Sequence, residues 1–302
     1  MKLAVPDLIT NSYFPAVAAA ELGFFHKEGL DVTVELIAPA GRTYEALRDG
    51  AVDFVAAEAH AGLAAFPGWK GMKLLCALSQ GMYWFLVMRA DIAGTRGDVS
   101  VVKGRRIAAA PWVELGLRRL LREAGIDPEH DLRIAPLEGS LGAKVNIGVT
   151  VAQALADGRI DGFWANGMGA ELAVCRGAGK VVLDVRRGDG PPAAFGYTLP
   201  TLAAADRLVE AEPAVAAAAV RAIRATLAAL KADPALATEA ARRVFPADET
   251  ALIAELVRRD LPYYDPALSA AMIDSMNQFA RDVGILEGHP RYEDVVAVGL
   301  PD

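Results

Sequence analysis

A short sequence pattern that occurs twice restricts the folds open to this 302-residue chain more than any other feature. The first copy is ALRDGAVDF at Ala46–Phe54, and the second, 108 residues later, begins the segment ALADGRIDGFWAN at Ala154–Asn166. Both copies read Ala-Leu-x-Asp-Gly-x-(Val/Ile)-Asp. Ala-Leu is typical of a helix end, Gly permits the left-handed residue that stops it, and the β-branched residue and Asp open a buried strand. Each copy therefore predicts a short helix, a tight turn and a strand.

The segments around the two copies also correspond. A predicted strand, helix and second strand precede each copy, and an Ala-rich segment, a Gly and an apolar strand follow it. The preceding segments are Lys2–Val5, Tyr13–Leu22 and Asp31–Ile37 for the first copy, and Arg105–Ala110, Trp112–Ala124 and Leu132–Pro136 for the second; the strands that follow are Met72–Leu78 and Lys180–Val185. The chain is therefore predicted to form two similar α/β lobes with a cleft between them, a length of 302 residues being enough for two domains.

Two apolar runs indicate where the chain passes between the lobes. Phe85–Arg89 leaves lobe one and Phe195–Pro200 returns to it, so we expect lobe one at 1–89 with 195–302 and lobe two at 90–194. Two crossings make a hinge, because a few residues can absorb the dihedral change while each lobe stays rigid. From Asp206 onward the periodicity is helical, and we expect these C-terminal helices to pack on lobe one.

Composition excludes some classes of protein and leaves the compartment open. A net charge of −7 and no run rich in Lys or Arg argue against nucleic-acid binding. No unbroken apolar run approaches the roughly 18 residues that span a bilayer, so membrane insertion is not expected. Both cysteines are expected to be buried free thiols. The start MKLAVPDL lacks the features of a secretory signal, which predicts a periplasmic protein if a signal was removed and a cytoplasmic protein otherwise.

Four segments in order resemble one known family: LGFFHKEGLDVTVEL, YEALRDGAVDFV, VVKGRRIAA and QALADGRIDGFWAN. Together they are similar to the substrate-binding proteins of ABC transporters, in the NMT1/THI5-like and aliphatic-sulfonate-binding subgroup, which are type II periplasmic binding proteins. The resemblance implies a two-lobed fold in which each lobe is a mixed, mainly parallel sheet with flanking helices. It also implies hinge closure on a small solute and delivery to an ABC permease. We expect a monomer without a cofactor.

Candidate ligand-binding residues follow from the position of ligands in open α/β sheets. Such ligands lie beyond the carboxyl ends of the strands, where loops and helix N-termini converge. The residues that this rule selects are Asn11, Ser12, Tyr13, Arg42, Glu58, His60, Gln80, Tyr83, Trp84, Trp112, Glu114, Glu138, Ser140, Trp164 and Asn166. Because small-molecule sites are mostly apolar walls with a few polar groups, an aromatic or heterocyclic solute is predicted.

Several of these residues admit a structural interpretation as well. Trp84, Trp112 and Trp164 would be the walls of the site, but each could instead be a core side chain. Glu114 could simply complement the dipole of its helix. Acidic residues in the set favour a cationic or donor-rich solute, whereas Arg42 could pair with a carboxylate of the solute or with Glu58 in the empty site.

Catalytic motifs give little support to an enzyme. The chain contains no G-x-S-x-G, H-E-x-x-H, P-loop or C-x-x-C pattern. Glu58 and His60, two residues apart at a strand end, would point to opposite faces and make a poor metal site. Two alternatives to a transport protein remain. One is a cytoplasmic enzyme on the same scaffold, THI5-like or resembling decarboxylases and dehydratases, and the other is an intracellular ligand sensor.

Overall fold

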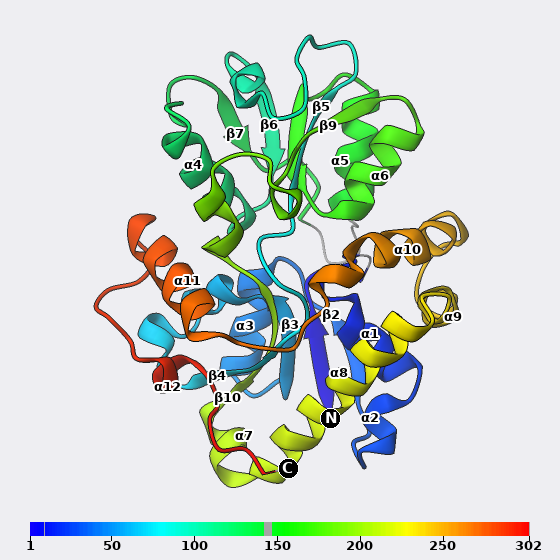
Figure 1. Ribbon diagram of the computed structural model, residues 1–302, viewed down its shortest axis with the longest axis vertical. Helices are drawn as coiled ribbons and strands as arrows, with labels where there is room; N and C mark the ends of the chain where they lie inside the picture. The colour runs from blue at the N-terminus through cyan, green and yellow to red at the C-terminus, as the bar shows by residue number, and fades with distance from the viewer. Residues whose placement is uncertain (9, 142–146, 302) are drawn as a thin grey trace. The chain divides into compact units, whose positions relative to one another are not determined.

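The computed structural model describes residues 1–8, 10–141 and 147–301 (Figure 1). The chain divides into two compact units. The first unit contains Met1–Gly81 and the chain from Thr198 to the C-terminus, and the second is the continuous segment Met82–Tyr197. Each unit has a five-stranded sheet, so the predicted α/β fold with two lobes is confirmed.

The sheet of the first unit has the strand order β2-β1-β3-β10-β4. Its strands are β1 (Lys2–Val5), β2 (Thr33–Leu36), β3 (Phe54–Glu58), β4 (Met72–Ala77) and β10 (Pro200–Ala205). β1 runs parallel to β2 and β3, whereas β10 runs antiparallel to both β3 and β4. The sheet is therefore mixed, and β10, which comes after the whole second unit in the sequence, lies between two strands from the first part of the chain.

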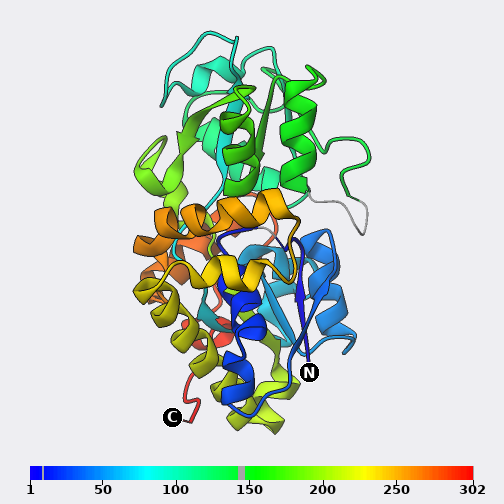
Figure 2. The same cartoon turned by 90° about the vertical axis from the view of Figure 1, so that its right-hand side faces the viewer.

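Helices cover this sheet. They are α1 (Phe14–Glu21), α2 (Phe24–Lys27), α3 (Ala40–Arg48), α7 (Asp206–Ala211), α8 (Pro213–Ala232), α9 (Leu236–Ala241), α10 (Ala247–Asp260), α11 (Ala270–Asp282) and α12 (Tyr292–Val295), with 3₁₀ turns η1 (Ala59–Ala64), η2 (Pro67–Trp69) and η6 (Leu261–Tyr263). α8 packs on α1 and α2, as Figure 2 shows from the side, and α9 packs on α1. The prediction that the C-terminal helices pack on lobe one is confirmed.

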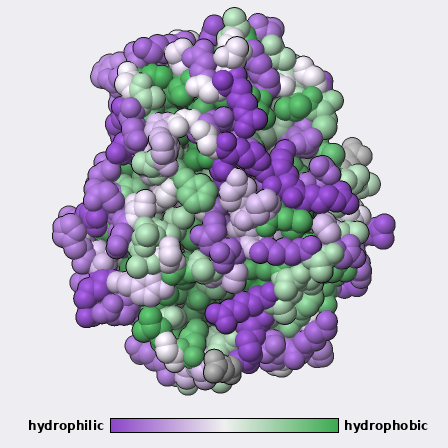
Figure 3. Space-filling model, in the orientation of Figure 1, coloured by the Kyte–Doolittle hydropathy of each residue, from purple (hydrophilic) through white to green (hydrophobic). Residues whose placement is uncertain are grey.

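Among the described residues, one helix, α8, is long and apolar enough to cross a bilayer by length and composition alone. More than half of its most apolar window is buried inside the first unit, against α1, α2 and β4. This burial is typical of a core helix. Hydrophilic and hydrophobic residues are intermixed over the face drawn in Figure 3, and the large hydrophobic side chains exposed in the described residues are Val174 and Val298.

The sheet of the second unit repeats this architecture, with the order β7-β6-β8-β5-β9. Its elements are β5 (Phe85–Arg89), β6 (Arg106–Ala109), β7 (Arg133–Ala135), β8 (Gly162–Ala165), β9 (Gly179–Asp184), α4 (Val113–Glu123), α5 (Ile147–Ala156), α6 (Gly167–Cys175), and the 3₁₀ turns η3 (Val99–Val102), η4 (Val185–Arg187) and η5 (Pro192–Tyr197). β6 is parallel to β7 and β8, and β5 is antiparallel to β8 and β9. β5 thus occupies the place that β10 has in the first sheet.

The repeated pattern has the same conformation in both units. It joins α3 to β3 and α5 to β8, and its glycines, Gly50 and Gly158, have φ of 74° and 70°. In each copy, the amide one residue after the Gly donates to a carbonyl five residues earlier, at 2.9 Å for Ala51 and 3.0 Å for Arg159. These bonds end the two helices in the same way, because they satisfy carbonyls that the helices leave open.

Two sequence-based expectations need correction. The predicted boundary left Phe85–Arg89 in lobe one, but β5 hydrogen-bonds to β8 and β9 and belongs to the second unit. Periodicity identifies a strand and does not identify its partners. Cys76 is buried as expected, whereas Cys175, the last residue of α6, is exposed. Its Sγ donates to Glu171 Oε1 at 3.3 Å.

Candidate functional site

A group of buried polar side chains lies at one edge of the first sheet. Because β10 is antiparallel to its neighbours, its start lies beside the ends of β3 and β4, with Pro200 opposite Glu58 and Thr201 opposite Ala77. We call this the carboxyl edge of the first sheet. Its buried polar residues are Asp7, Thr10, Asn11, Ser12, Glu58, His60, Ser79 and Thr198. The sequence predicted Asn11, Ser12, Glu58 and His60 among them.

His60 is held in place on two sides. Its Nδ1 lies 2.9 Å from Thr198 Oγ1, and its ring meets the ring of Phe279 edge to face, with 5.4 Å between centroids. Nearby, Ser79 Oγ donates to the carbonyl of Ser12 at 3.3 Å. The imidazole is thus positioned by residues far away in the sequence.

Asn11 presents an open acceptor at this edge. Its Nδ2 donates to a carboxylate oxygen of Asp260, the last residue of α10, which fixes the orientation of the amide. Its Oδ1 is then buried and accepts no hydrogen bond from the residues that the structure describes. A buried acceptor without a donor is costly, by about 1–3 kcal/mol, unless a ligand or water satisfies it.

The charges around Tyr13 give this edge an acidic character. The side chain of Tyr13 is buried, and desolvation raises the pKa of its phenol well above 10, with the carboxylates of Asp7 and Glu58 raising it further. The phenol therefore stays protonated and can donate. The carboxylates of Asp7 and Glu58 thus lie near enough to Tyr13 to act on its pKa.

Two predicted residues of this unit are placed differently from the others. Arg42 is exposed on α3, and no ion pair joins it to the buried Glu58 in the described ranges, so the suggested pairing in the empty site is wrong. Gln80 uses its side-chain amide to donate to the carbonyls of Asp265 and Ala267, at 2.9 and 2.8 Å. Gln80 thereby links the end of β4 to the segment that follows η6.

Aromatic side chains gather at the corresponding edge of the second sheet. Trp84 precedes β5 and Trp164 lies in β8, and their ring centroids are 6.3 Å apart. Tyr83 lies 5.1 Å from Trp84, and Trp164 Nε1 donates to the carbonyl of Val113 at 3.2 Å. Trp84 and Trp164 are only 3% and 1% exposed, so in this structure they are packed inside the unit.

Trp112 differs from these two tryptophans in both exposure and backbone. It is half-buried and forms the N-cap of α4, with φ of 70° and ψ of −45°. A residue with a side chain rarely adopts this region, which costs on the order of 1–3 kcal/mol, and such strain clusters at functional sites. Among the predicted aromatic walls, Trp112 is therefore the one that is not buried, and its role in binding stays a prediction.

The remaining predicted residues of the second unit form local contacts. Glu114 Oε2 accepts from Nε and Nη2 of Arg118, both at 2.9 Å, one turn further along α4. Ser140 is buried and its Oγ donates to the carbonyl of Leu137 at 2.7 Å, whereas Glu138 is exposed. Asn166 caps α6, because its Oδ1 accepts from the amide of Gly169 at 3.1 Å. These contacts explain Glu114, Ser140 and Asn166 structurally, and the binding roles of all four residues stay predictions.

Arg186 is a residue that sequence reasoning missed. It lies in η4, directly after β9, at the same edge as Trp84. Its side chain is buried, at 6% residue exposure, and its guanidinium carbon lies 5.5 Å from the centroid of Tyr83. The sequence shows only RRGDGPP, which is typical of a turn, and nothing local distinguishes the buried Arg186 from the partly exposed Arg187. Asp7, Thr198 and Asp260 were missed for the same reason.

The sequence model described as NMT1/THI5 like matches residues 10–237, which include most of the residues described above. The chain belongs to the NMT1/THI5-like family. No curated protein matches the sequence.

Solved structures share the fold of this NMT1/THI5-like protein at low sequence identity. A protein of Bordetella bronchiseptica RB50 is 20% identical with a TM-score of 0.75, covering 93% of this chain and 88% of its own. The periplasmic aliphatic sulphonate binding protein SsuA of Escherichia coli is 14% identical with a TM-score of 0.68, covering 98% and 91%. The desulfurization enzyme DszB is 16% identical with a TM-score of 0.65, covering 94% and 93%. Binding proteins and an enzyme thus share this architecture.

Proposed function

We propose that this protein binds a small solute through the carboxyl edges of its sheets, as the solute-binding component of an ABC import system. The observation that carries the proposal is the buried, open acceptor of Asn11 at the edge where ligands of α/β sheets bind. The NMT1/THI5-like family and the likeness to SsuA support a binding role. In this role the protein acts as a monomer, meets a permease, and works in the periplasm if it is exported.

The proposed solute carries hydrogen-bond donors and a flat ring. Asn11 Oδ1 and the carboxylates of Asp7 and Glu58 are acceptors, which suits an amine, amidine or ring N–H better than a sulfonate. The half-buried ring of Trp112 offers a stacking surface, which suits a heterocycle. The proposed class of solute therefore differs from the sulfonates named in the description of SsuA.

The test compares two tryptophans that share one backbone feature. Trp112 and Trp69 both have positive φ, at 70° and 65°, but Trp69 is buried and its Nε1 donates to Asn277 Oδ1 at 2.9 Å. Trp112→Gly relieves strain and should change the free energy of unfolding by less than about 1 kcal/mol. Trp69→Gly removes a packed indole and should cost about 3–5 kcal/mol.

Binding is measured by calorimetry with a panel of aminated heteroaromatic compounds and a panel of alkanesulfonates. We expect a heteroaromatic compound to bind, and Trp112→Gly to weaken that binding by about ten-fold or more, equivalent to about 1.4 kcal/mol. Asn11→Ala should weaken it as well, because the donor of the solute loses its acceptor. Binding of sulfonates alone would contradict the proposed solute class. Unchanged binding in Trp112→Gly would remove Trp112 from the site.

A second candidate is an enzyme on this scaffold, favoured by the likeness to DszB and by the positioned imidazole of His60. Mass spectrometry of the solute after long incubation distinguishes the two candidates. An unchanged solute supports binding, whereas turnover that is lost in His60→Gln supports the enzyme. Hinge closure remains a prediction, and small-angle scattering should show a smaller radius of gyration when the solute is added.

A further inference from the structure

A segment of the first unit lies along the carboxyl edge of the first sheet, between α10 and α11. We call residues 260–267 the edge segment. The amide of Ala77 donates to the carbonyl of Pro266 at 3.0 Å, and the amide of Gln80 donates to the carbonyl of Tyr263 at 2.7 Å. The side-chain amide of Gln80 donates to the same segment. The edge segment is therefore fixed beside the end of β4.

The edge segment also holds Asn11, through two separate contacts. The hydroxyl of Tyr264 donates to the backbone carbonyl of Asn11 at 2.6 Å. A carboxylate oxygen of Asp260 accepts from the side-chain Nδ2 of Asn11. Tyr264 and Asp260 are both buried, at 0% and 1% exposure. One contact thus fixes where the backbone of Asn11 lies, and the other acts on its side chain alone.

The contact with Asp260 decides which atom of the Asn11 amide is left open. An asparagine amide has nearly the same shape when its oxygen and nitrogen are exchanged, so packing alone does not choose between the two orientations. A carboxylate only accepts hydrogen bonds, so Asp260 must meet the NH₂ group. Oδ1 is then the buried atom for which the described residues provide no donor. Asp260 therefore makes Asn11 present an acceptor, although the same side chain could present a donor.

We propose that Asp260 is a positioning residue that sets the specificity of the solute site. By holding Nδ2 of Asn11, it makes the site select a solute with a hydrogen-bond donor over a solute of the same shape without one. This inference rests on the proposed function, because it requires that the solute meet Asn11. A solute without the donor would leave Oδ1 of Asn11 buried and unsatisfied, and sites of this kind reject such analogues strongly.

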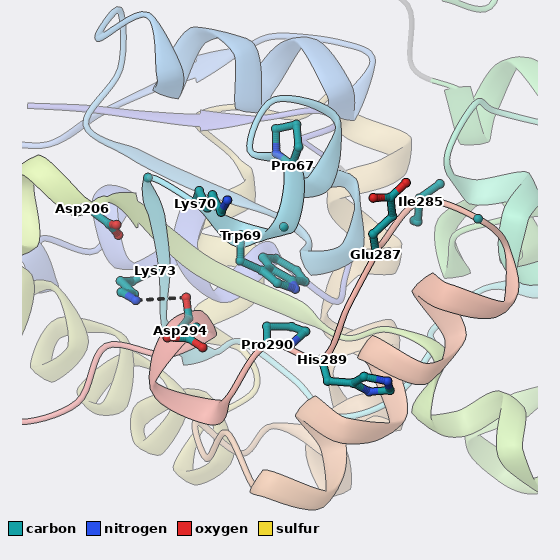
Figure 4. Close-up of a pocket in the computed structure, with 13 residues that line it drawn as sticks. Pro67, Trp69, Lys70, Lys73, Asp206, Ile285, Glu287, His289, Pro290 and Asp294 are labelled. Atoms are coloured by element: carbon teal, nitrogen blue, oxygen red, sulfur yellow. Dashed lines mark hydrogen bonds between the residues drawn. The ribbon is translucent and has the colours of Figure 1, made fainter.

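A surface pocket at the opposite edge of the first sheet provides a control. This pocket, of about 840 Å³, lies beside the start of β4 and is lined partly by charged side chains (Figure 4). Among them, Lys73 Nζ donates to the carbonyls of Glu293 and Asp294 at 2.7 and 3.0 Å, a contact that joins β4 to α12. Glu287 lines the same pocket and is exposed. Glu287→Gln therefore removes an acidic charge from the first unit without touching Asn11 or Asp260.

The test is calorimetric titration of the full chain with 3-aminopyridine and 3-methylpyridine. The two probes have nearly the same shape and are both uncharged in weakly alkaline buffer, so they differ in the donor alone. We expect the wild type to bind the amine about ten-fold more tightly or better. In Asp260→Asn the new amide can donate or accept, so both orientations of Asn11 are open, and the preference should fall below about three-fold. Tyr264→Phe releases only the backbone carbonyl and should keep the preference, as should Glu287→Gln.

Hydrogen exchange of the Asn11 side-chain amide tests the positioning without a solute. NMR identifies this NH₂ group by the loss of its signal in Asn11→Ala. We expect slow exchange in the wild type, because the group is buried and donates to Asp260, and loss of that protection in Asp260→Asn. The measurement on the wild type remains decisive if Asp260→Asn fails to fold.

The outcomes separate this inference from the function on which it rests. An unchanged preference for the amine in folded Asp260→Asn would overturn the inference, and so would fast exchange of the Asn11 side-chain amide in the wild type. Both results leave the proposed function standing. An equal loss of preference in Tyr264→Phe would show general loosening of the site and would overturn the specific role of Asp260. A wild type that binds alkanesulfonates and neither pyridine would overturn the proposed solute class, and the inference with it.

Discussion

At the scale of single residues, the last aspartate of the repeated pattern has the same structural role in both copies. Asp53 Oδ2 accepts from the amide of Lys2 at 2.7 Å, and Asp161 Oδ2 accepts from the amide of Arg106 at 2.9 Å. Lys2 and Arg106 are the first residues of β1 and β6. The amide of each aspartate also donates back to the same residue's carbonyl, at 3.0 and 2.9 Å. Each aspartate thus fixes the start of a neighbouring strand.

Asp161 makes the stronger set of contacts and provides the first prediction. Its carboxylate also accepts from Arg106 Nε at 3.0 Å and Nη2 at 3.1 Å, and from Arg89 Nη1 at 3.4 Å. Because Asp161→Asn removes charge-assisted bonds, it should lower the free energy of unfolding at pH 7 by about 1.5–3 kcal/mol. Denaturant unfolding measures this. The control Asp157→Asn changes an exposed aspartate nearby and should stay within about 0.5 kcal/mol.

The same residue makes stability depend on pH. The hydrogen bond from Arg106 is the largest cause that holds the pKa of Asp161 below its ordinary value of 3.8. A carboxylate whose pKa is lowered in the folded state stabilises the fold fully when the pH is above its pKa in the unfolded state. This stability is lost as the pH falls through its pKa in the folded state. The stability difference between wild type and Asp161→Asn should therefore shrink below about pH 4. A difference that stays constant from pH 7 to pH 3 would contradict this assignment.

At the scale of elements, α8 depends on small residues along its buried face. It begins with Pro213, whose missing amide is tolerated in the first turn, and it buries Ala219 and Ala222 completely. Alanine at these positions lets neighbouring elements approach α8 closely, since a larger side chain would need space that a close-packed interior lacks, and α8 packs against α1, α2 and β4. The close packing of these helices is therefore set by side-chain size and not only by hydrophobicity.

Two alanines of α8 provide a matched test of this packing. Ala222 is buried and Ala228 is exposed, and both lie in the interior of the same helix. Ala222→Leu should overpack the interface and lower the free energy of unfolding by about 1–3 kcal/mol. Ala228→Leu adds the same atoms on the exposed side and should change it by about 0.5 kcal/mol or less. Equal effects in thermal unfolding would show that packing on the buried face of α8 does not limit side-chain size.

At the scale of the whole molecule, the two units differ in how the chain builds them. The second unit is one continuous segment, and all five strands of its sheet lie between Met82 and Tyr197. The first unit needs both ends of the chain, because β10 lies between β3 and β4 and bonds to both. The second unit can therefore form without the first sheet, whereas the first sheet cannot form from its N-terminal part alone.

This difference predicts the behaviour of fragments. An isolated segment Met82–Tyr197 should unfold cooperatively, with the stability of about 5–15 kcal/mol that is common for domains. The segment Met1–Gly81 should show no cooperative transition, since β3 and β4 would lack the strand between them. Circular dichroism during heating distinguishes these results. A cooperative transition in Met1–Gly81 would mean that its strands pair without β10.

The sequence alone determined the features that depend on neighbours in the chain. The Asp-Gly turns, the strands beside them and the two similar lobes follow from local backbone preferences and periodicity. The rule for α/β sheets then located Asn11, Glu58 and His60 at one edge, because it needs only the ends of strands.

Only the tertiary structure decided which side chains meet. Asn11 pairs with Asp260, and His60 with Thr198, across 249 and 138 residues of chain, and β5 joins the second sheet. Burial of Trp84 and Trp164, and the open acceptor of Asn11, result from such contacts. The physical reason is that backbone conformation is set within a few residues, whereas burial and hydrogen-bond satisfaction depend on every element that packs around a group.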